Sequence, residues 1–95
     1  MKYQNTKFQE LFGDSNRVKI MEFYLESGDI AFPIEAVVEE KNIGKSQTYE
    51  IINSMIKNNI LIEDKIYNKK RFYKLNKKNE TILELIKLFN KIIIP

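Results

Sequence analysis

The sequence of 95 residues contains no cysteine and no histidine. Their absence excludes disulfides, thiolate nucleophiles, acid–base catalysis by imidazole and the usual zinc sites. No run of about 18 or more apolar residues, the length that spans a bilayer, is present. The first five residues also lack the apolar segment of a signal peptide. We therefore expect a cytoplasmic protein that does not enter a membrane.

The sequence also lacks the residue groups on which catalysis depends. No nucleophile stands beside a base, and there is no phosphate-binding loop and no cluster of metal ligands. Two pairs of adjacent acids, Glu39-Glu40 and Glu63-Asp64, are the nearest approach to such a group. Neighbours on a helix point in different directions, so Glu39 and Glu40 are interpreted as solvated surface. We expect a protein that is not an enzyme and that has no cofactor and no metal.

Basic residues are distributed unevenly. Residues 1–64 hold 7 basic and 11 acidic groups, a net charge of −4, although the whole chain has a net charge of +3. Residues 65–78 hold seven basic groups and no acid. Such a run is usually only solvated surface. Here it coincides with a predicted hairpin beside a polar helix, and this coincidence favours phosphate binding.

The spacing of apolar and turn residues predicts one small domain, mainly α with a small β-hairpin. The hydrophobic fraction of 43% is enough for one core. Residues 7–78 are expected to form the core and the hairpin, and residues 79–95 a C-terminal helix. The predicted helices cover about 8–12, 15–27, 34–41, 45–57 and 80–93, with a short extended piece at 30–32 and a hairpin over 60–75.

Local signals support several of these boundaries. Asp14 is a good N-cap for the second helix, and Asn79 for the last. In the turn at 42–44, Asn and Gly tolerate a left-handed backbone, and Ile43 is suited to fill the space between two helices. Asn68 is the expected left-handed residue at the hairpin tip, which is predicted at 67–70.

The predicted helix 45–57 has two contrasting faces. One face suits a core and carries Thr48, Ile51, Ile52, Met55 and Ile56. The other is polar and carries Ser46, Tyr49, Glu50, Asn53 and Lys57. A helix of this kind can be held by a protein and offered to the edges of DNA bases.

Three segments carry a resemblance to a known family. They read N-I-G-K-S-Q-T-Y at 42–49, N-I-L-I at 59–62 and R-F-Y-K-L at 71–75. With the order of the predicted elements, they make residues 8–93 resemble the winged helix-turn-helix regulators of the ArsR/MarR type common in archaea. The resemblance implies an archaeal or viral transcription regulator with a winged helix-turn-helix domain and an added C-terminal helix.

The resemblance further implies binding to double-stranded DNA as a dimer. The helix 45–58 would enter the major groove and the wing, 65–75, would touch the backbone or the minor groove. Tyr49 can be a groove residue, or its ring can lean on the core edge with only the hydroxyl exposed, and both alternatives stay open. The expected DNA-binding residues are Lys45, Ser46, Gln47, Tyr49, Glu50, Asn53, Lys57, Lys69, Lys70 and Arg71.

The C-terminal helix is apolar further round its circumference than one core face requires. Such a helix is either buried on several sides or paired with another chain. We expect a homodimer, with the first helix as part of the interface; the alternative is that the last helix folds back on its own domain. The expected interface residues are Phe8, Leu11, Phe12, Ile82, Leu85, Ile86, Phe89, Ile92 and Ile93.

The leading hypothesis is thus a sequence-specific DNA-binding transcription regulator. Two other functions are compatible with the sequence. One is a winged-helix module that docks a protein partner, and the other is a chromatin or replication accessory that binds DNA without sequence preference. The basic run at 65–78 favours nucleic acid over a protein partner.

Overall fold

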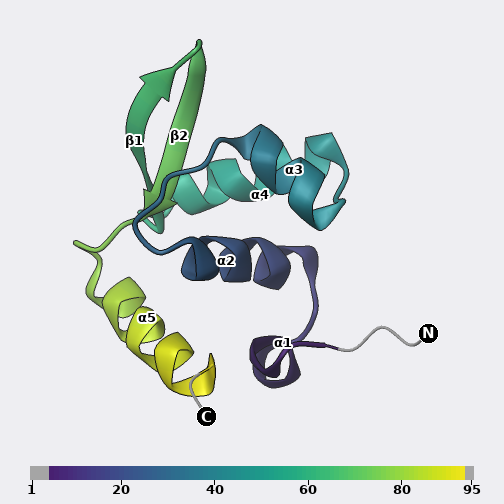
Figure 1. Ribbon diagram of the computed structural model, residues 1–95, viewed down its shortest axis with the longest axis vertical. Helices are drawn as coiled ribbons and strands as arrows, with labels where there is room; N and C mark the ends of the chain where they lie inside the picture. The colour runs from purple at the N-terminus through teal and green to yellow at the C-terminus, as the bar shows by residue number, and fades with distance from the viewer. Residues whose placement is uncertain (1–4, 94–95) are drawn as a thin grey trace.

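The helices and the hairpin follow one another in the predicted order (Figure 1). The structure is a computed structural model and describes residues 5–93, so most of the expected N-terminal tail lies outside the described residues. Within that range the helices are α1 Lys7–Phe12, α2 Asn16–Ser27, α3 Ile34–Lys41, α4 Lys45–Lys57 and α5 Glu80–Ile93, and the strands are β1 Leu61–Tyr67 and β2 Lys70–Leu75.

Side-chain caps fix where the helices begin. The predicted cap of α5 is confirmed, because the Asn79 side chain accepts a hydrogen bond of 3.0 Å from the Thr81 amide. The predicted cap of α2 is wrong. Ser15, not Asp14, caps this helix and accepts a hydrogen bond of 3.2 Å from the Val18 amide. Serine and aspartate cap equally well, so the sequence alone does not choose between two adjacent candidates.

The helices α2, α3 and α4 enclose the centre of the core. Ile20, Val37 and Ile52, one from each helix, are completely buried there. The turn between α3 and α4 has the predicted design, since Asn42 is left-handed with φ 53° and Ile43 is buried. The pair α3 and α4 therefore forms the helix-turn-helix unit.

The strands β1 and β2 form an antiparallel hairpin, here called the wing, that projects beyond the helices in Figure 1. Asn68 and Lys69 make the tip, and both are left-handed, with φ 50° and 64°. Only Asn68 was predicted; the two-residue turn requires positive φ at both positions. The extended piece before α3 joins the base of the wing, where Phe32 and Tyr73 exchange backbone hydrogen bonds of 2.9 Å.

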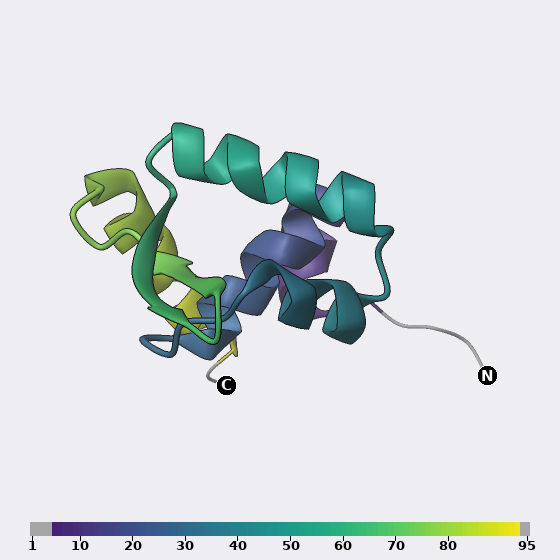
Figure 2. The same cartoon turned by 90° about the horizontal axis from the view of Figure 1, so that it is seen from above.

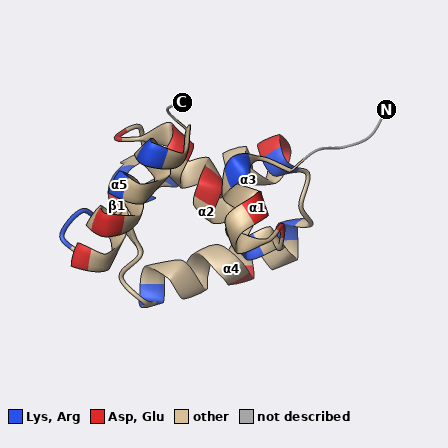
Figure 3. Ribbon diagram, turned by 90° about the horizontal axis from the view of Figure 1, so that it is seen from below, with Lys and Arg blue, Asp and Glu red and all other residues tan. Residues whose placement is uncertain are grey.

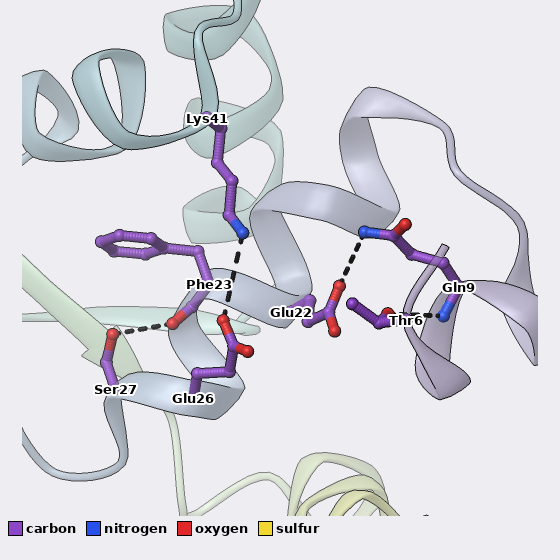
Figure 4. Close-up of polar contacts among 7 residues, drawn as sticks. All are labelled: Thr6, Gln9, Glu22, Phe23, Glu26, Ser27 and Lys41. Carbon is purple, nitrogen blue, oxygen red and sulfur yellow. Dashed lines mark hydrogen bonds and ion pairs between the residues drawn. The ribbon is translucent and has the colours of Figure 1, made fainter. Parts of the chain in front are cut away.

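The terminal helices α1 and α5 form a layer on the side of α2 away from the wing (Figure 1). The rings of Phe8 and Phe89 meet edge to face with centroids 5.6 Å apart. A polar contact also joins α1 to α2, because the Gln9 side-chain amide donates a 2.9 Å hydrogen bond to the buried Glu22 carboxylate (Figure 4). These contacts attach α1 and α5 to the body of the same chain.

The terminal layer divides the residues expected at the dimer interface. Phe8, Ile82 and Phe89 are buried inside the chain itself, so in this arrangement they cannot offer their surface to a partner. Leu11, Phe12 and Ile93 are exposed, and the remaining three, Leu85, Ile86 and Ile92, are partly buried. The helix α5 thus packs on its own domain and still leaves apolar surface outside. No helix within residues 5–93 has the length and apolarity to cross a membrane.

Candidate functional site

The helix α4 presents a continuous polar face to solvent. Thr48, Ile51, Ile52 and Met55 point inward and are buried, so the helix is anchored along one side. Figure 2 shows α4 running along one edge of the molecule, with the wing close to its C-terminal end. The predicted contact residues that lie exposed on its outer side are Lys45, Ser46, Gln47, Glu50, Asn53 and Lys57.

Gln47 is held in place by a residue of another helix. Its side-chain oxygen accepts a hydrogen bond of 2.9 Å from the side-chain amide of Asn16 on α2. An amide oxygen has two lone pairs, so Gln47 keeps one acceptor site and both of its N–H donors for a ligand. The contact with Asn16 reduces the freedom of Gln47 without using up its hydrogen-bonding capacity.

Tyr49 differs from its neighbours because its hydroxyl faces the protein. It is half-buried and donates a 2.8 Å hydrogen bond to the carboxylate of Glu35 on α3. This bond lowers the pKa of Glu35 and raises the pKa of Tyr49. The Tyr49 ring packs against the core, as in the second alternative, but its hydroxyl is bonded to Glu35 and is not the exposed group that this alternative expected. The side chain therefore ties α3 to α4.

A hollow of about 240 Å³ separates the wing from the two helices of the helix-turn-helix unit. The Glu35–Tyr49 pair lies in it, and the charges of Lys70 and Lys45 lower the pKa of Glu35 further. The residues that line this hollow are Ile34, Glu35, Tyr49, Lys69, Lys70, Arg71 and Tyr73. The hollow brings the predicted wing residues next to α4, on which the other predicted contacts lie.

The basic run at 65–78 is more nearly neutralised than its sequence suggests. Three of its members face acids from other parts of the chain: Arg71 pairs with Glu63 at 3.7 Å, Lys74 with Asp64 at 3.1 Å, and Lys77 with Asp29. On the side of the molecule shown in Figure 3, basic and acidic residues are interspersed. The other four members of the run form no ion pair with any described residue, and two of them, Lys69 and Lys70, lie at and beside the tip of the wing.

Sequence reasoning missed the residues that support the site from neighbouring elements. Asn16 holds Gln47, Glu35 holds Tyr49, and Arg17 donates a 3.3 Å hydrogen bond to the Ser54 hydroxyl on α4. Each contact spans 14 to 37 positions in the chain, and no local pattern indicates it.

Among residues 5–93, no group of three or more histidine, cysteine, aspartate or glutamate side chains is placed to hold a metal ion.

No protein-family model and no curated protein sequence matches the chain. Solved structures do resemble it. HlyU from Vibrio cholerae has a TM-score of 0.65 at 11% identity, over 85% of this chain and 83% of that one. A homodimeric winged helix-turn-helix DNA-binding domain from Mycobacterium bovis, a possible ArsR-family regulator, has a TM-score of 0.62 at 9% identity, over 90% and 74% of the two chains.

The iron-bound ferric uptake regulator of Francisella tularensis is also similar, with a TM-score of 0.60 and 20% identity over 70% of this chain. The match spans about half of that regulator, 54% of its chain. At these identities the likeness shows the fold. The predicted fold class is confirmed: a winged helix-turn-helix domain with a hairpin wing and a C-terminal helix.

Proposed function

We propose that the protein binds double-stranded DNA as a homodimer and regulates transcription. The observation that carries the proposal is the polar face of α4, with six exposed side chains, close to Lys69 and Lys70 of the wing, which form no ion pair within residues 5–93. This combination matches what duplex recognition needs, a helix that fits the major groove and cations that reach the phosphates. The similar structures support it, since one is described as a homodimeric DNA-binding domain.

In this proposal the first two turns of α4 read bases. The Gln47 side chain can both donate a hydrogen bond to adenine and accept one from it. The hydrogen bond from Asn16 keeps this side chain oriented. Lys45 and Ser46 stand beside it at the helix start, where exposed amides and the helix dipole also favour phosphate. Glu50 lies one turn further along α4, and its carboxylate can accept a hydrogen bond from the amino group of cytosine. Asn53 and Lys57 extend the same exposed face.

The wing supplies backbone contacts. Lys69 and Lys70 are the strongest candidates, because neither forms an ion pair with a described residue. Arg71 is a weaker one, since Glu63 lies 3.7 Å from its guanidinium. Both side chains of that pair are largely exposed, so the pair is worth little and can open when a phosphate approaches.

The dimer is proposed to form through the exposed apolar part of the terminal layer. Leu11, Phe12 and Ile93, together with Leu88 on α5, leave apolar surface in contact with water. A second copy of the chain would cover it. Two-fold pairing would also place two copies of α4 about 34 Å apart, one turn of duplex, and so select palindromic sites.

A salt titration tests the wing contacts. Replacing Lys69 and Lys70 together with alanine should weaken binding to every duplex and reduce the log–log salt slope by about 1.8, or 0.9 for each phosphate contact. The matched control is Lys87→Ala, which removes an exposed charge that pairs with Glu84 on α5. Its slope should stay that of the wild type. An unchanged slope in the double variant would remove the wing from the interface.

Selection of bound duplexes from a random pool separates the proposal from its alternatives. A palindromic consensus is the expected result. Equal binding to all duplexes would instead indicate an accessory without sequence preference, and no binding to any duplex would favour a module that docks a protein.

A further inference from the structure

The face of the wing that points away from the helices carries two aromatic rings and a lysine that duplex binding does not use. Tyr73 is buried on the helix side and lines the hollow beside Tyr49. Side chains alternate along a strand, so Phe72 lies on the opposite face. Lys65 is its cross-strand partner, and Tyr67 follows two residues later on the same face. We call Lys65, Tyr67 and Phe72 the outer wing face.

Phe72 contacts both of the other side chains of the outer wing face. The rings of Tyr67 and Phe72 meet edge to face with centroids 6.3 Å apart. The Lys65 ammonium lies 5.3 Å from the centroid of the Phe72 ring. These contacts order the patch but do not cover it, because Tyr67 remains 62% exposed. An aromatic ring that is held at its edge and open to solvent is a surface on which another flat ring can stack.

The charge around these rings points to the kind of ligand. The nearest acid along the strand, Asp64, is already paired with Lys74 at 3.1 Å. Lys65 has no ion pair with a described residue, and Lys69 follows at the tip. An apolar protein surface would leave these cations without partners, whereas a polynucleotide offers bases to the rings and phosphates to the ammonium groups.

We propose that the outer wing face binds single-stranded nucleic acid, with an unpaired base stacked on Tyr67 and the neighbouring phosphates near Lys65. Bases within a duplex are already stacked on each other, so the surface favours unpaired strands. Stacking tolerates any base, because every base has an aromatic face, and binding should show little sequence preference. The site does not depend on the proposed contacts of α4, although at the tip it adjoins Lys70, the cross-strand partner of Tyr67, which is also a proposed duplex contact.

Fluorescence anisotropy with a labelled oligothymidylate of about twelve nucleotides tests the inference. Tyr67→Ala should weaken binding roughly tenfold or more, and Tyr67→Phe, which keeps the ring, should retain wild-type affinity. The matched control is Ile66→Ala. Ile66 is 60% exposed on the same strand but pairs with Arg71 on the other face, so its loss should change affinity by less than about twofold.

Three outcomes would overturn the inference. They are no binding of the oligonucleotide by the wild-type protein, equal losses for Tyr67→Ala and Ile66→Ala, and equal affinity for an abasic strand of the same length, which would indicate charge alone. Each is measured beside a duplex titration of the same samples. Retained duplex binding in Tyr67→Ala keeps the two sites separate. A wild-type protein that binds the oligonucleotide but no duplex would contradict the proposed function and leave this inference standing.

Discussion

The two ends of the molecule expose opposite chemistry. At the wing end, α4 and the hairpin tip present amides, hydroxyls and lysines, and the wing's ion pairs Arg71–Glu63 and Lys74–Asp64 lie at the surface. At the other end, the terminal layer of α1 and α5 exposes the apolar side chains of Leu11, Phe12 and Leu88, of which Phe12 is 47% exposed. One end is suited to a polyanion and the other to apolar surface.

This difference has a consequence for how the two ends respond to salt. Contacts of exposed charges with phosphate weaken steeply as salt displaces them, because counterion release supplies much of their free energy. The burial of apolar surface releases no counterions, and many salts strengthen it. Raising the salt concentration should therefore separate the two proposed activities, with the dimer persisting after the DNA has dissociated.

The largest change in stability is expected for a residue buried inside the terminal layer. Phe89 is 2% exposed and meets Phe8 edge to face. Phe89→Ala should lower the free energy of unfolding by about 3–5 kcal/mol, because it removes buried surface and leaves a cavity. Urea unfolding measures the change. Leu88 directly precedes Phe89 but lies on the exposed side, so Leu88→Ala should change the free energy of unfolding by less than about 0.5 kcal/mol. Similar losses for both would mean that α5 is not packed as described.

The second prediction concerns substitutions on the exposed side of the same layer. Replacing both Phe12 and Leu88 with glutamate should convert the proposed dimer into a monomer, because two like charges would oppose their copies across a two-fold axis. Sedimentation velocity at tens of micromolar should show at least a hundredfold rise in the dimer dissociation constant, which is about 2.7 kcal/mol.

The unfolding midpoint of the same variant is its control. Both side chains are already exposed, so the substitutions should cost the folded monomer little. The variant should unfold at nearly the same urea concentration as wild-type protein diluted until it is monomeric. Glutamate at Phe89 would be a poor test, because that position is buried and the protein would unfold for reasons unrelated to pairing. A wild-type protein that sediments as a monomer at these concentrations would contradict the proposed dimer.

The fold followed from the sequence because its signals are local. The apolar spacing of α4, the turn at 42–44, the left-handed Asn68 and the cap Asn79 each depend on residues within one turn of each other. The choice between Asp14 and Ser15 failed for the opposite reason, because both satisfy the same local rule. The free positive charge of residues 65–78 was overestimated, since Asp29 and Glu63 come to pair with Lys77 and Arg71 only after folding.

The candidate site was predicted less completely than the fold. On the exposed face of α4, Ser46, Glu50, Asn53 and Lys57 follow from the helical period, whereas Lys45 and Gln47 follow from the family resemblance. The residues that hold these side chains in place do not follow from the helical period, because Asn16 and Glu35 belong to other helices and reach α4 through tertiary packing. The division of the terminal layer into a buried and an exposed side likewise depends on where α1 sits, which periodicity within α5 does not determine.

The smallest expected effect concerns the tie between α3 and α4 at the polar end. Tyr49→Phe removes the hydroxyl that donates to Glu35 and should lower the free energy of unfolding by about 1 kcal/mol at neutral pH, since the bond is only partly buried. Tyr67→Phe is the control, because the Tyr67 hydroxyl has no hydrogen-bond partner among the described residues. Urea unfolding over a range of pH is the measurement.

The pH dependence of that difference identifies its cause. The bond lowers the pKa of Glu35, so its contribution is present above the ordinary carboxyl pKa and is lost as the pH falls through the lowered value. The bond also raises the pKa of Tyr49, so the contribution is lost again as the pH rises through that raised value. The gap between wild type and Tyr49→Phe should therefore be widest near neutral pH and should close at both extremes. A gap that stays constant from pH 3 to pH 7 would show that Tyr49 acts through the packing of its ring and not through the charge of Glu35.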